Sequence, residues 1–80
     1  MNYPTSAQSV RIAGEVRAEM ARGRVTGTTL AQTVGMSNAT LSRRLSGAIP
    51  FNIDELAAVA RALGLTVTEL LTRAEAGDAA

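Results

Sequence analysis

The chain has 80 residues, carries no cysteine and no histidine, and has a net charge of +1. This length allows one small domain, and the missing residue types exclude disulfides and the usual zinc ligands. No apolar run approaches the roughly 18–20 residues of a membrane helix, and the first residues lack the basic and then apolar pattern of a signal peptide. We therefore expect a cytoplasmic protein with no metal, no cofactor and no membrane partner.

Residues 1–8 are predicted to form an N-terminal arm that leads into the first helix, with Thr5 and Gln8 at the spacing of a capping box. Apolar residues then recur at four-residue steps and face inward: Ile12, Val16 and Met20. The charged residues between them, Glu19 included, are expected to face solvent. Gly23 is predicted to end this helix, and Arg22 and Arg24 frame the turn into Thr26.

Two short helices joined by a tight turn are predicted between Thr26 and Gly47. Thr26 and Ser37 can each cap a helix, because a hydroxyl accepts a hydrogen bond from a free backbone N–H group. Gly35 lies between the two helices, where a residue without Cβ can turn left-handed without strain. The second helix ends at Gly47.

The second of these helices has two different faces. Leu41 and Leu45 form its inward pair, four residues apart. The opposite face carries small, polar and guanidinium groups: Asn38, Ala39, Ser42 and Arg43. Such groups suit base edges and phosphates. The pattern therefore predicts a helix that lies in the major groove of DNA.

Two further helices follow the connector at residues 48–50. Asn52 with Glu55, and Thr66 with Glu69, have the spacing of a capping box. The inward residues of the first are predicted to be Ile53, Leu56, Ala57, Ala60 and Leu63. Those of the second are Val67, Leu70, Leu71 and Ala74. The centre of the core should contain Leu30, Val34, Leu41, Leu45, Leu56 and Leu63, with Phe51 closing it. Residues 74–80 are predicted to be a flexible C-terminal tail.

The segment TGTTLAQTVGMSNATLSRRLSG resembles the helix-turn-helix of the lambda-repressor-like family (Cro/repressor, or XRE), in its actinobacterial or phage members. The matching features are Leu30-Ala31, Val34-Gly35-Met36, Leu41 and Ser46-Gly47. With its flanking helices, the resemblance covers residues 9–73, the predicted DNA-binding domain. It implies an all-α domain of five helices. In that fold the second and third helices form the helix-turn-helix, and residues 38–46 read the major groove.

The charge distribution points to the same segment. Four arginines and no acidic residue lie between Met20 and Ile53: Arg22, Arg24, Arg43 and Arg44. Such a run is usually only a solvated surface. Because this acid-free window coincides with the helix-turn-helix, it predicts a footprint for DNA phosphates.

Individual contacts follow from the side chains. Asn38 can bond an adenine edge, and Arg43 can reach a guanine or a phosphate; alternatively, Asn38 is a second cap and Arg43 is only solvated. Arg44 stands where the resembling family usually has an aliphatic core residue, and we expect it to contact a phosphate. The full set predicted to bind DNA is Arg24, Gly27, Thr28, Ser37, Asn38, Ala39, Thr40, Ser42, Arg43, Arg44 and Ser46.

An enzyme is not expected, because no histidine, cysteine or lysine can act as base or nucleophile. The sequence predicts a regulator that binds specific double-stranded DNA, a repressor without effector control. Two alternatives remain: an antitoxin or other helical module that binds a protein, and a small phage factor of Cro or excisionase type. We expect a monomer or weak homodimer that pairs mainly on DNA, through Val67 and Leu71 of the last helix.

Overall fold

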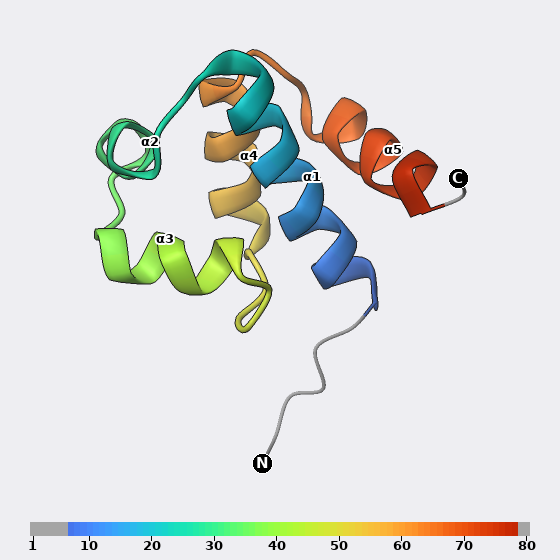
Figure 1. The fold of residues 1–80 in the computed structure, drawn as a ribbon, viewed down its shortest axis with the longest axis horizontal. Coiled ribbons are helices and arrows are strands. Elements are labelled where there is room, and N and C mark those ends of the chain that lie inside the picture. The colour runs from blue at the N-terminus through green and yellow to red at the C-terminus, as the bar shows by residue number, and fades with distance from the viewer. Residues whose placement is uncertain (1–6, 79–80) are drawn as a thin grey trace.

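The computed structural model describes residues 7–78, which form five α-helices (Figure 1). These are α1 (Ala7–Gly23), α2 (Gly27–Val34), α3 (Asn38–Leu45), α4 (Ile53–Ala62) and α5 (Val67–Asp78). No strand occurs within the described range, so the prediction of an all-α fold with five helices is confirmed. The predicted arm at residues 1–6 and its cap Thr5 lie outside the described residues.

All four caps predicted for α2 to α5 are present. In each, a side-chain oxygen accepts from the backbone N–H group three residues later: Thr26, Ser37, Asn52 and Thr66. At the start of α4 and of α5 the capping box is complete. The carboxylates of Glu55 and Glu69 accept in return from the backbone N–H groups of Asn52 and Thr66, both at 2.9 Å. These local bonds satisfy donors that a helix start leaves unpaired.

Helix α1 ends at Gly23, as predicted. The next residue, Arg24, adopts the left-handed conformation, with φ 54°. The turn is closed by bonds from the Val25 N–H to the Met20 carbonyl and from the Arg24 N–H to the Ala21 carbonyl, at 2.8 and 3.2 Å. A side chain in this conformation costs about 1–2 kcal/mol. The turn between α2 and α3 uses Gly35 instead, at φ 73°, as predicted.

All five helices contribute buried residues to one core. Its buried members are Val16, Met20, Leu30, Ala31, Leu41, Leu56, Val59, Ala60 and Leu70. Of the six predicted central residues, Leu30, Leu41 and Leu56 are buried, whereas Val34, Leu45 and Leu63 are half-buried and pack against the cluster, as does Phe51.

The predicted core of α4 contains two errors, at Ile53 and at Val59. Ile53 was expected to face inward but is 68% exposed, because it is the first residue of α4 and lies beyond the edge of the core. Val59 is completely buried although the predicted stripe omitted it. The predicted apolar stripe therefore lies on the correct face of α4, but it begins one turn too early, at Ile53.

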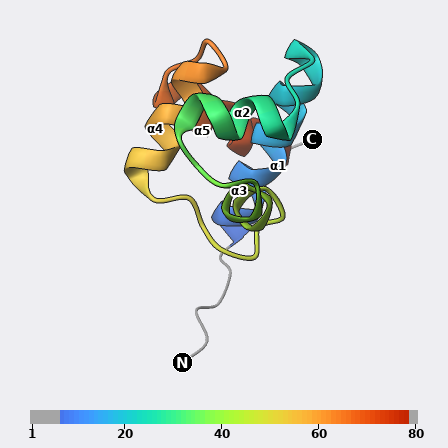
Figure 2. The ribbon, with the colours of Figure 1, turned by 90° about the vertical axis from the view of Figure 1, so that its left-hand side faces the viewer.

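Helix α5 packs most extensively on α1, whereas α2 packs on both α3 and α4. As a result α2 and α3 lie together on one side of the molecule and α5 lies on the other (Figures 1 and 2). The predicted flexible tail begins at residue 74, but α5 continues to Asp78 and Ala74 is 4% exposed. The contact of α5 with α1 extends the helix beyond what the sequence pattern indicates.

Glu19 contradicts the prediction that it faces solvent, since it is only 8% exposed. Its carboxylate accepts from the guanidinium groups of Arg22, at 2.6 Å, and Arg73, at 2.9 Å. Arg22 also pairs with Glu15 at 2.9 Å. The two arginines replace the water that burial removes from Glu19, and Arg73 thereby ties α5 to α1.

Candidate nucleic-acid interface

Buried leucines set the orientation of the helix-turn-helix. Leu30 anchors α2 and Leu41 anchors α3, and each is 1% exposed. Gly35 reverses the chain between the helices, and Ser37 then starts α3 by accepting from the Thr40 N–H at 3.1 Å. With Leu41 fixed inward, the opposite side of α3 must face solvent. Ala39, Ser42 and Arg43 are accordingly exposed.

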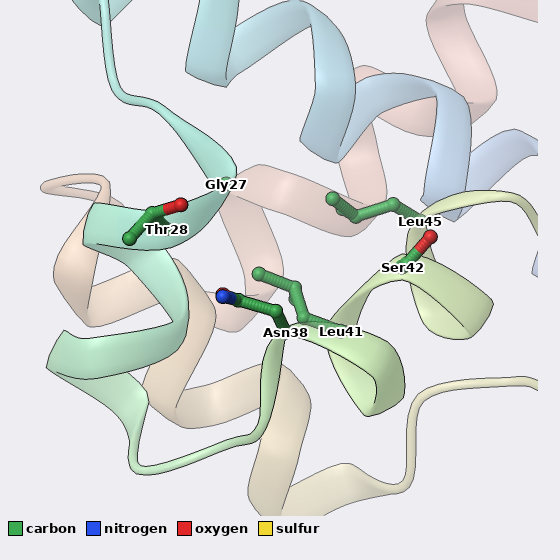
Figure 3. A pocket seen from close by; sticks show the side chains of 6 residues that line it. All are labelled: Gly27, Thr28, Asn38, Leu41, Ser42 and Leu45. Atoms are coloured by element: carbon green, nitrogen blue, oxygen red, sulfur yellow. The ribbon is translucent and has the colours of Figure 1, made fainter.

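An open groove of about 400 Å³ separates the start of α2 from α3. It is lined by Gly27, Thr28, Asn38, Leu41, Ser42 and Leu45 (Figure 3). Figure 3 shows Asn38, Leu41 and Leu45 projecting from α3 on the side of α2. Four residues predicted to bind DNA thus come together from two helices: Gly27, Thr28, Asn38 and Ser42. The two leucines were predicted only as core, and their edges form part of this groove.

The polar side chains on this surface are not used by the fold. Within residues 7–78, the side chains of Asn38, Ser42 and Arg43 make no hydrogen bond or ion pair. The same holds for Arg24, which is exposed two residues before the cap of α2. These groups therefore keep their full capacity to bind a ligand.

Three predicted residues have hydroxyl groups that the fold already uses. Ser37 donates to the Thr40 hydroxyl at 2.9 Å while capping α3. Ser46 donates to the Arg43 carbonyl at 3.0 Å and accepts from the Ala48 N–H at 3.2 Å. All three lie at the ends of α3, so they shape the helix ends, and any contact with a ligand would have to share these hydroxyls.

Arg44 does not face the groove surface. Its Nε and Nη2 atoms donate to Oε1 and Oε2 of Glu55 at 3.0 and 3.1 Å, and both side chains are 18% exposed. The hydrogen bond from Arg44 lowers the pKa of the Glu55 carboxyl, and the backbone bond from Asn52 lowers it further, although partial burial opposes both. Arg44 therefore forms an ion pair with α4 that the sequence analysis did not include, and its phosphate contact stays a prediction.

The acid-free window of the sequence is not acid-free in space. Two of its four arginines pair with carboxylates from outside the window: Arg22 with Glu15 and Glu19, and Arg44 with Glu55. The side chains of the other two, Arg24 and Arg43, have no partner within residues 7–78. Glu55 was predicted only as the partner of Asn52 in a capping box. Its ion pair with Arg44 was missed, because it depends on how α3 and α4 are placed in the fold.

Among the described residues, no group of three or more acidic, histidine or cysteine side chains could hold a metal ion. In the same part of the chain, no helix is long and apolar enough to cross a membrane.

Comparisons with known proteins agree with this architecture. The family model described as BetR domain matches residues 5–79. A crystal structure of the clp gene regulator ClgR from Corynebacterium glutamicum is similar with a TM-score of 0.87 and 28% identity, over 95% of this chain and 81% of that chain. Another crystal structure of ClgR from C. glutamicum gives 0.83 and 29%, over 94% and 96%. No curated protein matches the chain. These matches leave the finer lambda-repressor-like assignment, and its phage or actinobacterial type, as a prediction.

Proposed function

This chain belongs to the BetR domain family, and we propose that it is a transcription regulator that binds specific double-stranded DNA. The observation that carries the proposal is the exposed face of α3, where Asn38, Ser42 and Arg43 have polar groups that the described fold leaves unused. The similarity to ClgR, a clp gene regulator with the same arrangement of helices, supports the same function.

We propose that bases are read by residues 38–46, which comprise α3 and its C-terminal cap Ser46. An α-helix fits the major groove, and asparagine and arginine can form paired hydrogen bonds to adenine and guanine there. Asn38 lies at the start of α3 and Arg43 more than one turn later, so together they can span neighbouring base pairs. Ala39 offers a methyl group to thymine, and Ser42 adds an adaptable donor and acceptor.

Phosphates are proposed to be held at the start of α2. Arg24 supplies a positive charge, and the backbone N–H group of Gly27 and the hydroxyl of Thr28 supply donors beside the groove. A helix N-terminus favours an anion because its first N–H groups have no partner in the helix. The hydroxyls of Ser37, Thr40 and Ser46 are secondary contacts, because each already takes part in a local bond.

The test is selection of bound sites from random duplex DNA, followed by titration of the selected site at several salt concentrations. We expect a consensus sequence, and a binding constant that falls with salt at a log–log slope of about −0.9 per phosphate neutralised. A protein that enriches no sequence and shows no salt dependence would contradict the proposal and favour the alternative of a helical module, such as an antitoxin, whose partner is a protein.

The finer role that we propose is repression, because occupancy of a promoter is sufficient for it and needs no second protein contact. Transcription from a promoter that carries the selected site should then fall as protein is added. A rise in transcription would identify an activator instead. A protein with this role acts on chromosomal DNA, so we place it in the cytoplasm, on the nucleoid.

A weak homodimer that forms mainly on DNA is proposed through α5. Val67 and Leu71 are half-buried and already pack against the core, so only a small apolar surface remains for a partner. A stable interface buries about 800 Å² per partner, whereas two half-sites on DNA raise the effective concentration of two weakly associating copies. Sedimentation should show monomers alone and a two-to-one complex on a palindromic site. A tight dimer without DNA that survives Leu71→Glu would contradict this.

A further inference from the structure

Arg44 bridges two helices that make little backbone contact. The helix pairs that pack closely within the described residues are α1–α5, α2–α4, α2–α3, α1–α3 and α4–α5, and α3–α4 is not among them. Across this gap, two hydrogen bonds of 3.0 and 3.1 Å join the guanidinium of Arg44 to the carboxylate of Glu55. Two parallel bonds between planar groups fix orientation as well as distance.

The Glu55 end of this bridge is rigid. Its Oε1 atom also accepts from the Asn52 N–H at 2.9 Å, and the Asn52 side chain accepts from the Glu55 N–H at 2.7 Å. The next residue, Leu56, is 4% exposed and belongs to the core. The carboxylate that receives Arg44 is therefore fixed to the start of α4, and α4 is fixed to the core.

Helix α3 packs on α1 and α2, and neither of these contacts links it to α4. It has eight residues, of which only Leu41 is fully buried. Leu45 is half-buried, and Arg17 donates to its carbonyl from α1. A short helix with one fully buried side chain can still turn slightly about its axis, and such a turn would carry Asn38 and Arg43 away from the base edges they are proposed to contact. The Arg44–Glu55 pair opposes this turn, because it links α3 to α4 as well.

We infer that Arg44 is a positioning residue, which with Glu55 fixes the rotation of α3 so that Asn38 and Arg43 meet the correct bases. This inference rests on the proposed function and deepens it. It assigns the specificity of the DNA-binding helix partly to two side chains that do not touch DNA. The competing role for Arg44 is the phosphate contact predicted from the sequence, and the two roles require opposite responses to changes at Glu55.

Three variants separate the roles. Arg44→Met keeps an apolar stem and removes the guanidinium. Arg44→Lys keeps the positive charge, which would still serve a phosphate, but cannot form the two parallel bonds. Glu55→Gln keeps an oxygen for the Asn52 N–H group and removes the charge that orients Arg44. Arg24→Met is the matched control, because Arg24 is a proposed phosphate contact outside the pair. Circular dichroism confirms that each variant is folded at the temperature used.

Affinity is then measured for the selected duplex and for a duplex with a scrambled site, at several salt concentrations. A positioning role predicts that all three variants of the pair lose about tenfold in the ratio of the two affinities, the order of one misaligned base contact, while their salt slopes stay at the wild-type value. The control should instead lose affinity for both duplexes and reduce the slope by about 0.9.

The inference is overturned if Arg44→Met reduces the salt slope while Arg44→Lys binds normally and Glu55→Gln binds as tightly as wild type or more tightly. Removal of a nearby negative charge helps a phosphate contact, so that pattern identifies one. Unchanged selectivity in all three variants also overturns it.

A second measurement does not depend on DNA. The backbone amide chemical shifts of Asn38 and Ser42 should move in the same direction in Arg44→Met and Glu55→Gln, because both release the same rotation of α3. Amide shifts that do not move would overturn the inference. If wild-type protein selects no DNA sequence but the shifts move together, the proposed function fails while the pair still positions α3, so the two failures are distinguishable.

Discussion

Two neighbouring arginines of α3, Arg43 and Arg44, differ in their exposure and in their contacts. Arg43 faces solvent, and within residues 7–78 its side chain has no partner, whereas Arg44 is bound to Glu55 with only 18% of its side chain exposed. The serine hydroxyls differ in the same way. Ser42 makes no hydrogen bond with its side chain within residues 7–78, whereas the hydroxyls of Ser37 and Ser46 form bonds at the two ends of α3. The inner face of α3, with Leu41 and Arg44, takes part in the fold. Its outer face, with Asn38, Ser42 and Arg43, is left available for a ligand.

The most severe change to the inner face is Leu41→Ala. Leu41 is 1% exposed and anchors α3, so its truncation should cost about 2–5 kcal/mol of unfolding free energy, from lost burial and a cavity. Ile53→Ala is the matched control, because Ile53 is 68% exposed and surface changes usually stay within about 0.5 kcal/mol. Denaturant melts compare the two. Equal losses would mean that the inner face of α3 has been assigned wrongly.

On the outer face the largest change is expected from Arg43→Ala and Asn38→Ala. Each should cost about 1–3 kcal/mol of binding free energy on the selected site and relax the preference at one base pair. Neither should alter the melting transition, because the fold does not use these side chains. Titrations with single base substitutions measure the preference. A variant that binds normally but melts early would place that residue with the inner face.

These two faces also show how far the sequence could be interpreted. Caps and turns are local, so Thr26, Gly35, Ser37 and Asn52 were predicted from spacing alone and are confirmed. The inward position of Leu41 also followed from helical spacing. The proposed DNA contacts have the positions expected for them, but their binding role stays a prediction.

What the sequence could not provide are contacts made by packing. Arg44 and Glu55 are 11 residues apart, and Glu19 and Arg73 are 54 apart. No local pattern connects such pairs. Only a DNA contact was therefore predicted for Arg44, and Glu19 was expected to face solvent. Ala74 was predicted as an inward residue of α5 and is buried, but the continuation of α5 to Asp78 was not predicted. Long-range ion pairs thus decided which charged residues remained for a ligand.

Replacing Arg24 by glycine should change the stability of the fold and the affinity for DNA in opposite directions. Its left-handed backbone, at φ 54°, costs about 1–2 kcal/mol with a side chain present. Arg24→Gly relieves that strain and adds some chain entropy to the unfolded state, for a net gain of about 0.5–1 kcal/mol in stability.

The same variant should weaken DNA binding and reduce the salt slope by about 0.9, the loss of one phosphate contact. Gly35→Ala is the control, because it introduces strain at φ 73° and should only destabilise the fold. Thermal melts and salt titrations report the two properties separately. Arg24→Gly with unchanged DNA binding would remove Arg24 from the proposed site and leave its strained backbone without a functional reason.

The smallest expected effect is the dependence of the Arg44–Glu55 pair on pH. The bond from Arg44 lowers the pKa of Glu55 below its ordinary value of 4.5. A carboxyl with a lowered pKa in the folded state stabilises the fold at pH above 4.5, and this contribution disappears as the pH falls from 4.5 through the folded pKa. Glu55→Gln removes the titration, so its stability should fall less steeply than that of wild type in this range. We expect the difference to be below about 1 kcal/mol, as for ion pairs near the surface. Acid unfolding of the two proteins is followed by circular dichroism. Parallel curves would show that the Arg44–Glu55 pair does not contribute to the stability of the fold.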